Sequence, residues 1–277
     1  MKKSSTMLII LALAAGTLLC IAIYAVQKVE DDRFSDTLYS DAVSRYAGEV
    51  SDTGSDTDRY RVFADVTTGL SEQYPDVRAW LNVEGTSISY PVLQSDTNEY
   101  YLRRSYTGGS DRNGSIIADY RLYGELADNR NIVLYGHNTG TGRMLSDIAE
   151  IYYGGADGFS EMEIELFCCG KVYVFSPYSV YISGGNGFAK VFFASDEEFF
   201  EFVSETKSAS ETETGADTEG CKAVLTLVTC VSPVSKSDER IVLHAVCTRT
   251  ETVETFQPSE SDTSGAEDVS GSEAYLP

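Results

Sequence analysis

The chain has 277 residues, and its 43 acidic and 21 basic side chains give a net charge of −22 at neutral pH. This charge argues against a nucleic-acid partner, because phosphate backbones are bound by basic patches. The length suits one sizeable domain with extra segments at its ends, and with only two histidines no spacing typical of a zinc site is present.

An uncharged apolar run begins close to the N-terminus. Met7–Val26 is long enough to cross a hydrocarbon core of roughly 30 Å as a helix, and we predict an uncleaved membrane anchor. The alternative is a cleaved signal peptide, with Ala12 and Ala14 as the small residues of its cleavage site. Basic residues lie in segment 1–6 and acidic residues follow the run, which predicts a cytoplasmic N-terminus and an extracellular remainder.

The segment after the anchor, residues 27–58, is expected to hold a short helix and a linker. Phe34–Ala47 carries apolar residues at helical spacing, whereas Ser51–Asp58 is rich in turn-forming residues. The acidic residues of this linker do not follow the order of a calcium-binding loop, so we assign no metal to it. A second helix is predicted around Tyr60–Glu72.

From Pro75 onward the sequence predicts a mainly β fold, a closed sheet decorated with helices. Two helices are expected to interrupt it, one in RMLSDIAEIYY and one beginning at Ser195, where S-D-E-E forms a capping box. Ser204–Gly220 and the acidic tail 251–277 contain few large apolar groups and are predicted to be mobile. The expected strands are VRAWLNV, SISYPVL, SIIADYR, NIVLYG, EIELFCC, KVYVFSPYSVYI, KAVLTLVTC and RIVLHAVC.

Three side chains with complementary chemistry occur at predicted strand ends. Cys230 ends one strand and Arg240 opens the next, so antiparallel pairing would place both at the same edge of the sheet. His137 follows the strand NIVLY, on the first loop residues, where functional side chains concentrate. A thiolate, an imidazole and a fixed cation suffice for acyl transfer to and from a carbonyl group.

The order of these motifs resembles the sortases, membrane-anchored cysteine transpeptidases of Gram-positive bacterial surfaces. TLVTC is followed ten residues later by Arg240, with YGHN far upstream, and the likeness extends from about Tyr60 to Thr250. The stretches PDVRAWLNVEGTSISYPVLQ, NEYYLRRSY, GSIIADYR and YGHNTGTGRMLSDI are similar to class B members. This resemblance implies a catalytic domain at 59–250, an eight-stranded β-barrel with N-terminal helices and a helix in the loop before the nucleophile strand.

The resemblance also implies a role for each motif residue. Cys230 would be the nucleophile, His137 the acid that protonates the departing amine, and Arg240 the donor to the oxyanion or the substrate backbone. Asn98 and Leu102 match positions near the substrate groove of class B members.

The family reaction defines the expected partners. The thiol would attack the Thr carbonyl of a C-terminal sorting motif in secreted surface proteins, and an amine of peptidoglycan precursor or a pilin would resolve the thioester, with no metal or organic cofactor. The chain departs from class B members at Val228 and Val231, where a Ser and an acidic residue are common. The resemblance therefore leaves the exact sorting motif open.

Two other functions remain open at this stage. A cysteine hydrolase would transfer the same thioester to water. A catalytically silent surface or pilus component would instead hold Cys230 in a disulfide, with Cys221 or Cys247 as partner. His244 shares a strand face with Arg240 but lies about 13 Å along the strand, so we interpret it as structural.

Overall fold

A computed structural model describes residues 2–46, 55–155, 157–212, 214–234 and 237–253. Its strands are β1 Val77–Val83, β2 Ser89–Leu93, β3 Ile116–Ala118, β4 Asn131–Tyr135, β5 Ile164–Cys168, β6 Lys171–Ser183, β7 Val224–Cys230 and β8 Arg240–Thr252. Its helices are α1 Lys2–Tyr46, α2 Asp56–Gln73, α3 Ser146–Gly154, α4 Asp157–Ser160 and α5 Asp196–Ser208, with single 3-10 turns η1 Tyr100–Arg103, η2 Leu126–Asp128 and η3 Gly187–Ala189. Each of the eight strands lies where the sequence predicts one.

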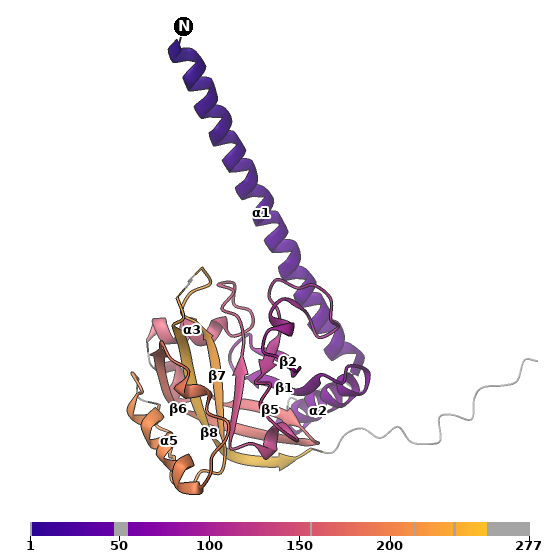
Figure 1. Ribbon diagram of the computed structural model, residues 1–277. Coiled ribbons are helices and arrows are strands. Elements are labelled where there is room, and N and C mark those ends of the chain that lie inside the picture. The colour runs from indigo at the N-terminus through magenta and orange to yellow at the C-terminus, as the bar shows by residue number, and fades with distance from the viewer. Residues whose placement is uncertain (1, 47–54, 156, 213, 235–236, 254–277) are drawn as a thin grey trace, which may run out of the picture.

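The strands form a closed barrel in the order β1-β2-β3-β4-β7-β8-β6-β5 (Figure 1). The β2/β3 and β4/β7 pairs are parallel, and the other pairs are antiparallel. The parallel β4/β7 pair matters most for the site, because parallel strands end at the same edge. Tyr135 at the end of β4 lies opposite Val228, two residues before the end of β7.

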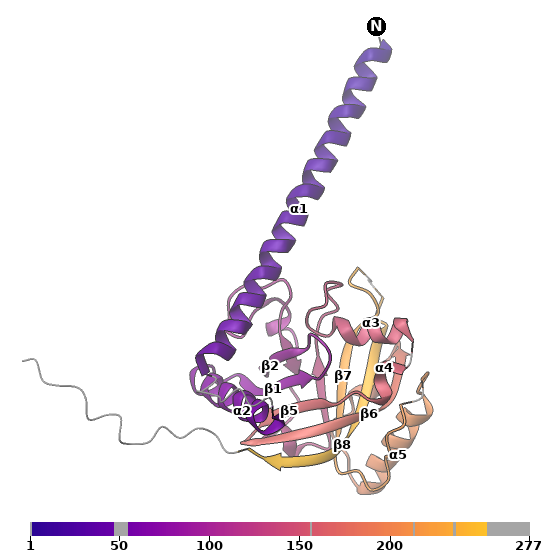
Figure 2. The ribbon, with the colours of Figure 1, turned by 180° about the vertical axis from the view of Figure 1, so that it is seen from behind.

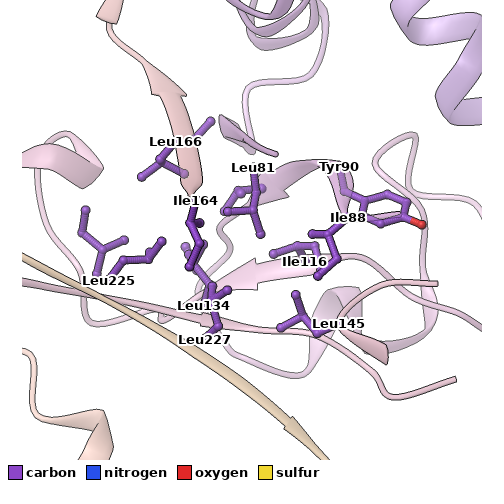
Figure 3. Packing of buried hydrophobic residues seen from close by; sticks show 14 of the residues in the cluster. Leu81, Ile88, Tyr90, Ile116, Leu134, Leu145, Ile164, Leu166, Leu225 and Leu227 are labelled. Carbon is purple, nitrogen blue, oxygen red and sulfur yellow. The ribbon is translucent and has the colours of Figure 1, made fainter. Parts of the chain in front are cut away.

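The barrel interior is filled by aliphatic side chains from every part of the sheet. Figure 3 shows Leu81 and Ile116 packing toward Leu134 and Leu227, which come from strands far apart in the sequence. The outer face of β7 is covered as well, because Phe199 and Phe202 of α5 pack over Val224. Because both faces of β7 are covered, its sequence is a nearly continuous apolar run.

The helix α1 has two parts with different surroundings. Its N-terminal part projects away from the barrel, as both ribbon views show (Figures 1 and 2), and its apolar side chains are exposed. Within the described residues, Ile9–Tyr46 is one helix long and apolar enough to cross a membrane. The short helix expected at Phe34–Ala47 is the C-terminal part of α1, which is described up to Tyr46. Of the expected linker Ser51–Asp58, residues 51–54 lie outside the described residues, whereas Asp56–Asp58 form the first turn of α2, because Ser55 caps that helix.

The C-terminal part of α1 packs against α2 and the barrel. Tyr39 and Ala42 are buried, and the ring of Tyr39 meets that of Tyr90 edge-on at a centroid distance of 5.1 Å. At the crossing with α2, a Cβ atom on Gly69 would lie 2.2 Å from Cδ1 of Tyr46. Glycine is therefore required for this close helix contact.

The segment Ser204–Gly220 is more structured than its composition predicts. α5 continues to Ser208, and the hydroxyl groups of Thr206 and Tyr178 lie 2.8 Å apart in the buried interface with β6. Beyond the helix, the backbone N–H of Glu211 donates to the carbonyl of Val180. Polar groups thus attach this segment to the barrel through hydrogen bonds, which a prediction based on apolar content does not detect. The expected mobile tail begins too early at residue 251, because Glu251 and Thr252 still pair with β6, and from residue 254 on it lies outside the described residues.

His244 is fully buried between two hydroxyl groups, as its structural interpretation requires. Its Nδ1 lies 2.8 Å from the Thr226 hydroxyl, and its Nε2 lies 3.1 Å from the Tyr181 hydroxyl. Burial disfavours the imidazolium and lowers the pKa of His244 to about 3. The side chain is consequently neutral in the folded protein at physiological pH.

We expect this buried histidine to make the fold sensitive to acid. Below the ordinary histidine pKa of about 6.5, the unfolded chain binds a proton at His244 that the folded chain does not bind. The contribution of neutral His244 to stability is therefore complete above this pH and is lost as the pH falls. The free energy of unfolding should decrease by about 1.4 kcal/mol per pH unit in this window from His244 alone. Denaturant unfolding of the wild type and His244→Gln from pH 7 to pH 4 measures the difference, and parallel curves would contradict it.

Candidate active site

Cys230 and Arg240 face each other across the open end of the β7/β8 pair. Cys230, the last residue of β7, is in register with Arg240, the first residue of β8, so the predicted antiparallel neighbours are confirmed. The Arg240 Nη1 donates to the carbonyls of Ser237 (3.1 Å) and Glu239 (2.8 Å). These bonds hold the guanidinium against its own turn, while Nε and Nη2 provide further N–H donors.

His137 lies beside this pair because β4 and β7 run parallel. The backbone continues the ladder one step past β4, where the N–H of Gly136 donates to the carbonyl of Val228 at 3.1 Å. The imidazole Nε2 then lies 2.8 Å from the carbonyl oxygen of Leu102. Because a carbonyl oxygen only accepts, Nε2 carries a hydrogen, and Nδ1 is the ring nitrogen that can take up or release a proton.

Electrostatics around His137 disfavour its charged form. Burial lowers the pKa of His137 below its ordinary value, the Leu102 carbonyl opposes this shift, and the positive charges of Arg103 and Arg240 add to it. The imidazole is therefore mainly neutral at neutral pH. Any step that needs the imidazolium draws on a minor protonated fraction.

Asn138 connects the histidine segment to the end of the cysteine strand. Its side-chain Nδ2 donates to the backbone carbonyl of Cys230 at 3.1 Å, and its Oδ1 accepts from the N–H of Gly140 at 3.1 Å. The loop bearing His137 and the residue bearing the thiol are thereby held together. Asn138 belongs to the YGHN stretch, but sequence analysis singled out only the histidine, because the amide acts through a backbone atom distant in the sequence.

A pocket of about 650 Å³ contains all five residues predicted from the sequence. Cys230, Arg240 and His137 line one part of it, together with Asn98 and Leu102. Val228 and Val231, the two positions at which the chain departs from the resemblance described above, have different surroundings. Val228 is buried and lines the pocket, whereas Val231 packs against the core and is not one of the lining residues.

A buried carboxylate that the sequence analysis missed also lines this pocket. Asp119 is fully buried and accepts two hydrogen bonds from Arg121, each of 2.8 Å, and one from the Tyr135 hydroxyl at 2.8 Å. Burial alone would raise the pKa of Asp119, but the bonds from Arg121 and Tyr135 outweigh it and lower this pKa. The position of Asp119 at the end of β3, where a strand meets a loop, was the available sequence signal.

Through this carboxylate, Asn98 is fixed to the pocket wall. Its Nδ2 lies 3.4 Å from Asp119 Oδ2, and its Oδ1 accepts from the backbone N–H of Tyr120 at 2.9 Å. Arg121 also reaches the carbonyl of Ala189 at 2.7 Å, in the connection between β6 and α5. The Asp119–Arg121 ion pair therefore links the segments of Asn98, Tyr135 and Ala189 around the pocket.

The six cysteines are free thiols in this structure. Cys221 and Cys247 line a second pocket near the start of β7, whereas Cys230 ends that strand. Val224 to Cys230 spans about 20 Å at about 3.3 Å per residue, and a disulfide requires Cα atoms within about 7 Å. The fold thus contradicts a disulfide between Cys230 and either thiol. Among the described residues, no group of three or more His, Cys, Asp or Glu side chains could hold a metal ion.

Comparison with known proteins gives consistent matches over the barrel. The sortase domain family matches residues 81–248. Sortase B of Staphylococcus aureus is 32% identical over 174 residues, covering 61% of this chain and 69% of that protein. Sortase B of Listeria monocytogenes is 26% identical over 226 residues, covering 78% and 86% respectively. A solved Staphylococcus aureus sortase B–substrate complex is 29% identical with a TM-score of 0.58, covering 68% of this chain and 86% of that one.

Proposed function

The chain belongs to the sortase family of cysteine transpeptidases and is a class B member, and from this premise we propose that it cleaves a C-terminal sorting motif after Thr and transfers the acyl group to an amine. The acceptor is an amine of peptidoglycan precursor or of a pilin. The observation that carries the proposal is the convergence of Cys230, Arg240 and His137 in one pocket at the open ends of β4, β7 and β8.

In the first half of the proposed reaction the Cys230 thiolate attacks the carbonyl carbon of the motif's Thr. The carbonyl π electrons move to oxygen, and Arg240 donates hydrogen bonds to this oxyanion or to the adjacent substrate backbone. The oxyanion then collapses, the C–N bond breaks, and the departing nitrogen takes a proton from His137. The products are an acyl thioester on Cys230 and a free amine on the released segment.

The second half reverses these steps with a new amine. The acceptor nitrogen attacks the thioester carbonyl and gives up a proton, and the C–S bond breaks to restore the thiolate. His137 exchanges protons through Nδ1, since Nε2 is bonded to the Leu102 carbonyl. A thioester suits this role because it retains enough acyl reactivity for an amine to resolve it.

Asn98 and Leu102 are proposed to contact the sorting motif. Both line the pocket, and each is tied to a group beside the reaction centre. The amide of Asn98 is oriented by Asp119, whereas the carbonyl of Leu102 bonds to His137. Substrate seated against these residues would lie along the wall that also fixes the imidazole.

We further propose that the apolar part of α1 anchors the protein in the cell membrane. In this arrangement residues 1–6 are cytoplasmic, 7–26 span the bilayer, and 27–58 connect to an extracellular catalytic domain at 59–250. The support is the exposure and length of this apolar helix and the basic residues that precede it. Secreted surface proteins bearing the sorting motif would meet the pocket on the same side of the membrane.

The products formed with and without an amine acceptor test the transpeptidase function. The full chain in detergent should be incubated with a panel of Thr-containing sorting-motif peptides, with or without a short amine-terminated peptide, and followed by mass spectrometry. We expect an amide product that joins the motif through its Thr to the acceptor. Cleavage to the free acid alone, unaffected by acceptor concentration, would favour the hydrolase alternative.

A further inference from the structure

Two loops that meet at His137 both rest on the part of α1 that follows its apolar run. The histidine loop, residues 136–145, connects β4 to α3 and carries His137. The leucine loop, residues 100–114, begins with η1 and carries Leu102, whose carbonyl accepts the bond from the imidazole. The orientation of the imidazole therefore depends on the relative position of these two loops.

The histidine loop is attached to α1 through Arg143. Its Nε and Nη2 bond to the two carboxylate oxygens of Asp36 at 2.8 and 2.5 Å, and its Nη1 lies 3.3 Å from Asp32 Oδ2. Within the loop, the N–H of Leu145 donates to the carbonyl of His137 at 3.1 Å. This bond joins the two ends of the loop that carries both Arg143 and His137.

The leucine loop is attached to the same face of α1. Asn113 Nδ2 donates to Asp32 Oδ1 at 3.2 Å, and the Ser35 hydroxyl donates to Asp111 Oδ2 at 2.8 Å. The N–H of Asp111 in turn donates to the carbonyl of Arg103 at 3.0 Å. Next to these residues Gly114 has a φ of +64°, and a Cβ there would lie 2.5 Å from the oxygen of Leu102. The loop is thus packed tightly around the carbonyl that holds the imidazole.

Asp32 is the point at which the two attachments coincide. One carboxylate oxygen accepts from the leucine loop and the other pairs with the histidine loop, and the residue is only 8% exposed. We propose that Asp32 is a positioning residue for His137, so that the helix continuing from the apolar segment sets the geometry of proton transfer. This inference rests on the proposed role of His137 as the acid.

The physical basis is the sensitivity of proton transfer to distance. Buried, charge-assisted hydrogen bonds have narrow geometry, and an ion pair that joins two loops fixes their separation. A misplacement of about 1 Å at a reacting group can lower a rate by about 100-fold, so a partial loosening should cost about tenfold. Because His137 acts after substrate is bound, the loss should appear in kcat rather than in KM.

The test compares Asp32→Ala with Asp31→Ala in the full chain in detergent. Asp31 is the adjacent carboxylate on the same helix, and its contact with the leucine loop is a half-exposed pair with Arg112 at 3.5 Å, outside the buried attachments made by Asp32. We expect kcat for amide formation to fall about tenfold in Asp32→Ala with KM within about twofold, and both constants to be unchanged in Asp31→Ala. Thermal unfolding verifies that both variants remain folded at the assay temperature.

A second measurement reports the geometry without relying on turnover. The chain has two histidines, and His244 is buried with a pKa of about 3, so an NMR titration of labelled imidazoles above pH 5 follows His137 alone. Looser loops expose the ring to water, and the pKa of His137 should rise toward its ordinary value in Asp32→Ala only. The proposal stands if both measurements change in Asp32→Ala and neither changes in Asp31→Ala, and any other pattern overturns it. If the wild type forms no amide product, it is the proposed function that fails instead.

Discussion

Replacing Cys230 with alanine is expected to abolish both cleavage of the sorting-motif peptide and formation of the amide product. The thiol is the atom that bonds to the acyl group, so no thioester forms without it, and we expect a loss of at least about 1,000-fold. Mass spectrometry of the protein after incubation with peptide provides the direct measurement. The wild type should carry the mass of the acyl group, and Cys230→Ala should not.

The matched control is Cys247→Ala. This thiol is also half-buried and belongs to β8 of the same strand pair, but it lies beside the start of β7, where it lines a different pocket. We expect Cys247→Ala to retain both the acyl adduct and the amide product. Product formation by Cys230→Ala within tenfold of the wild-type rate would contradict the assignment of the nucleophile.

Local sequence patterns were sufficient to predict the strands and one contact of the site. Strand positions follow from apolar runs bounded by turn residues, and the Cys230/Arg240 pair follows from a short connection between neighbouring strands. The adjacency of β4 and β7 has no such local signal, because nearly 90 residues separate them and their pairing is parallel. The position of His137 beside the pair was accordingly implied by a family resemblance rather than by spacing.

Polar contacts between distant segments account for most of what the sequence did not predict. Asp32 was read only as one of the acidic residues flanking an apolar run, yet it is buried between two loops. Asn138 likewise acts on a partner far along the chain, whereas Asp119 combines a local pair with Arg121 and a bond from Tyr135 on the next strand. A carboxylate in an acidic chain is by default a solvated charge, and only the fold shows which of them are enclosed by donors.

Replacing His137 with glutamine is expected to lower the rate of amide-bond cleavage by about 100- to 10,000-fold. Glutamine keeps an N–H that can donate to the Leu102 carbonyl, so the contact between the two loops can persist. It has no proton to give to the departing amine, which is a very poor leaving group as an anion. The measurement is the acylation rate of Cys230 with the sorting-motif peptide at saturating concentration.

An activated substrate separates the proton-donating role of His137 from a structural one. A motif peptide ending in a p-nitrophenyl ester of Thr loses p-nitrophenolate, a leaving group that needs no proton. If His137 serves as the acid, His137→Gln should acylate from this ester within about tenfold of the wild-type rate while remaining defective on the amide. Equal losses on both substrates would instead assign the effect to placement or ionisation of the thiol. The same comparison applied to Cys230→Ala should abolish both reactions, because every step of either substrate passes through the sulfur.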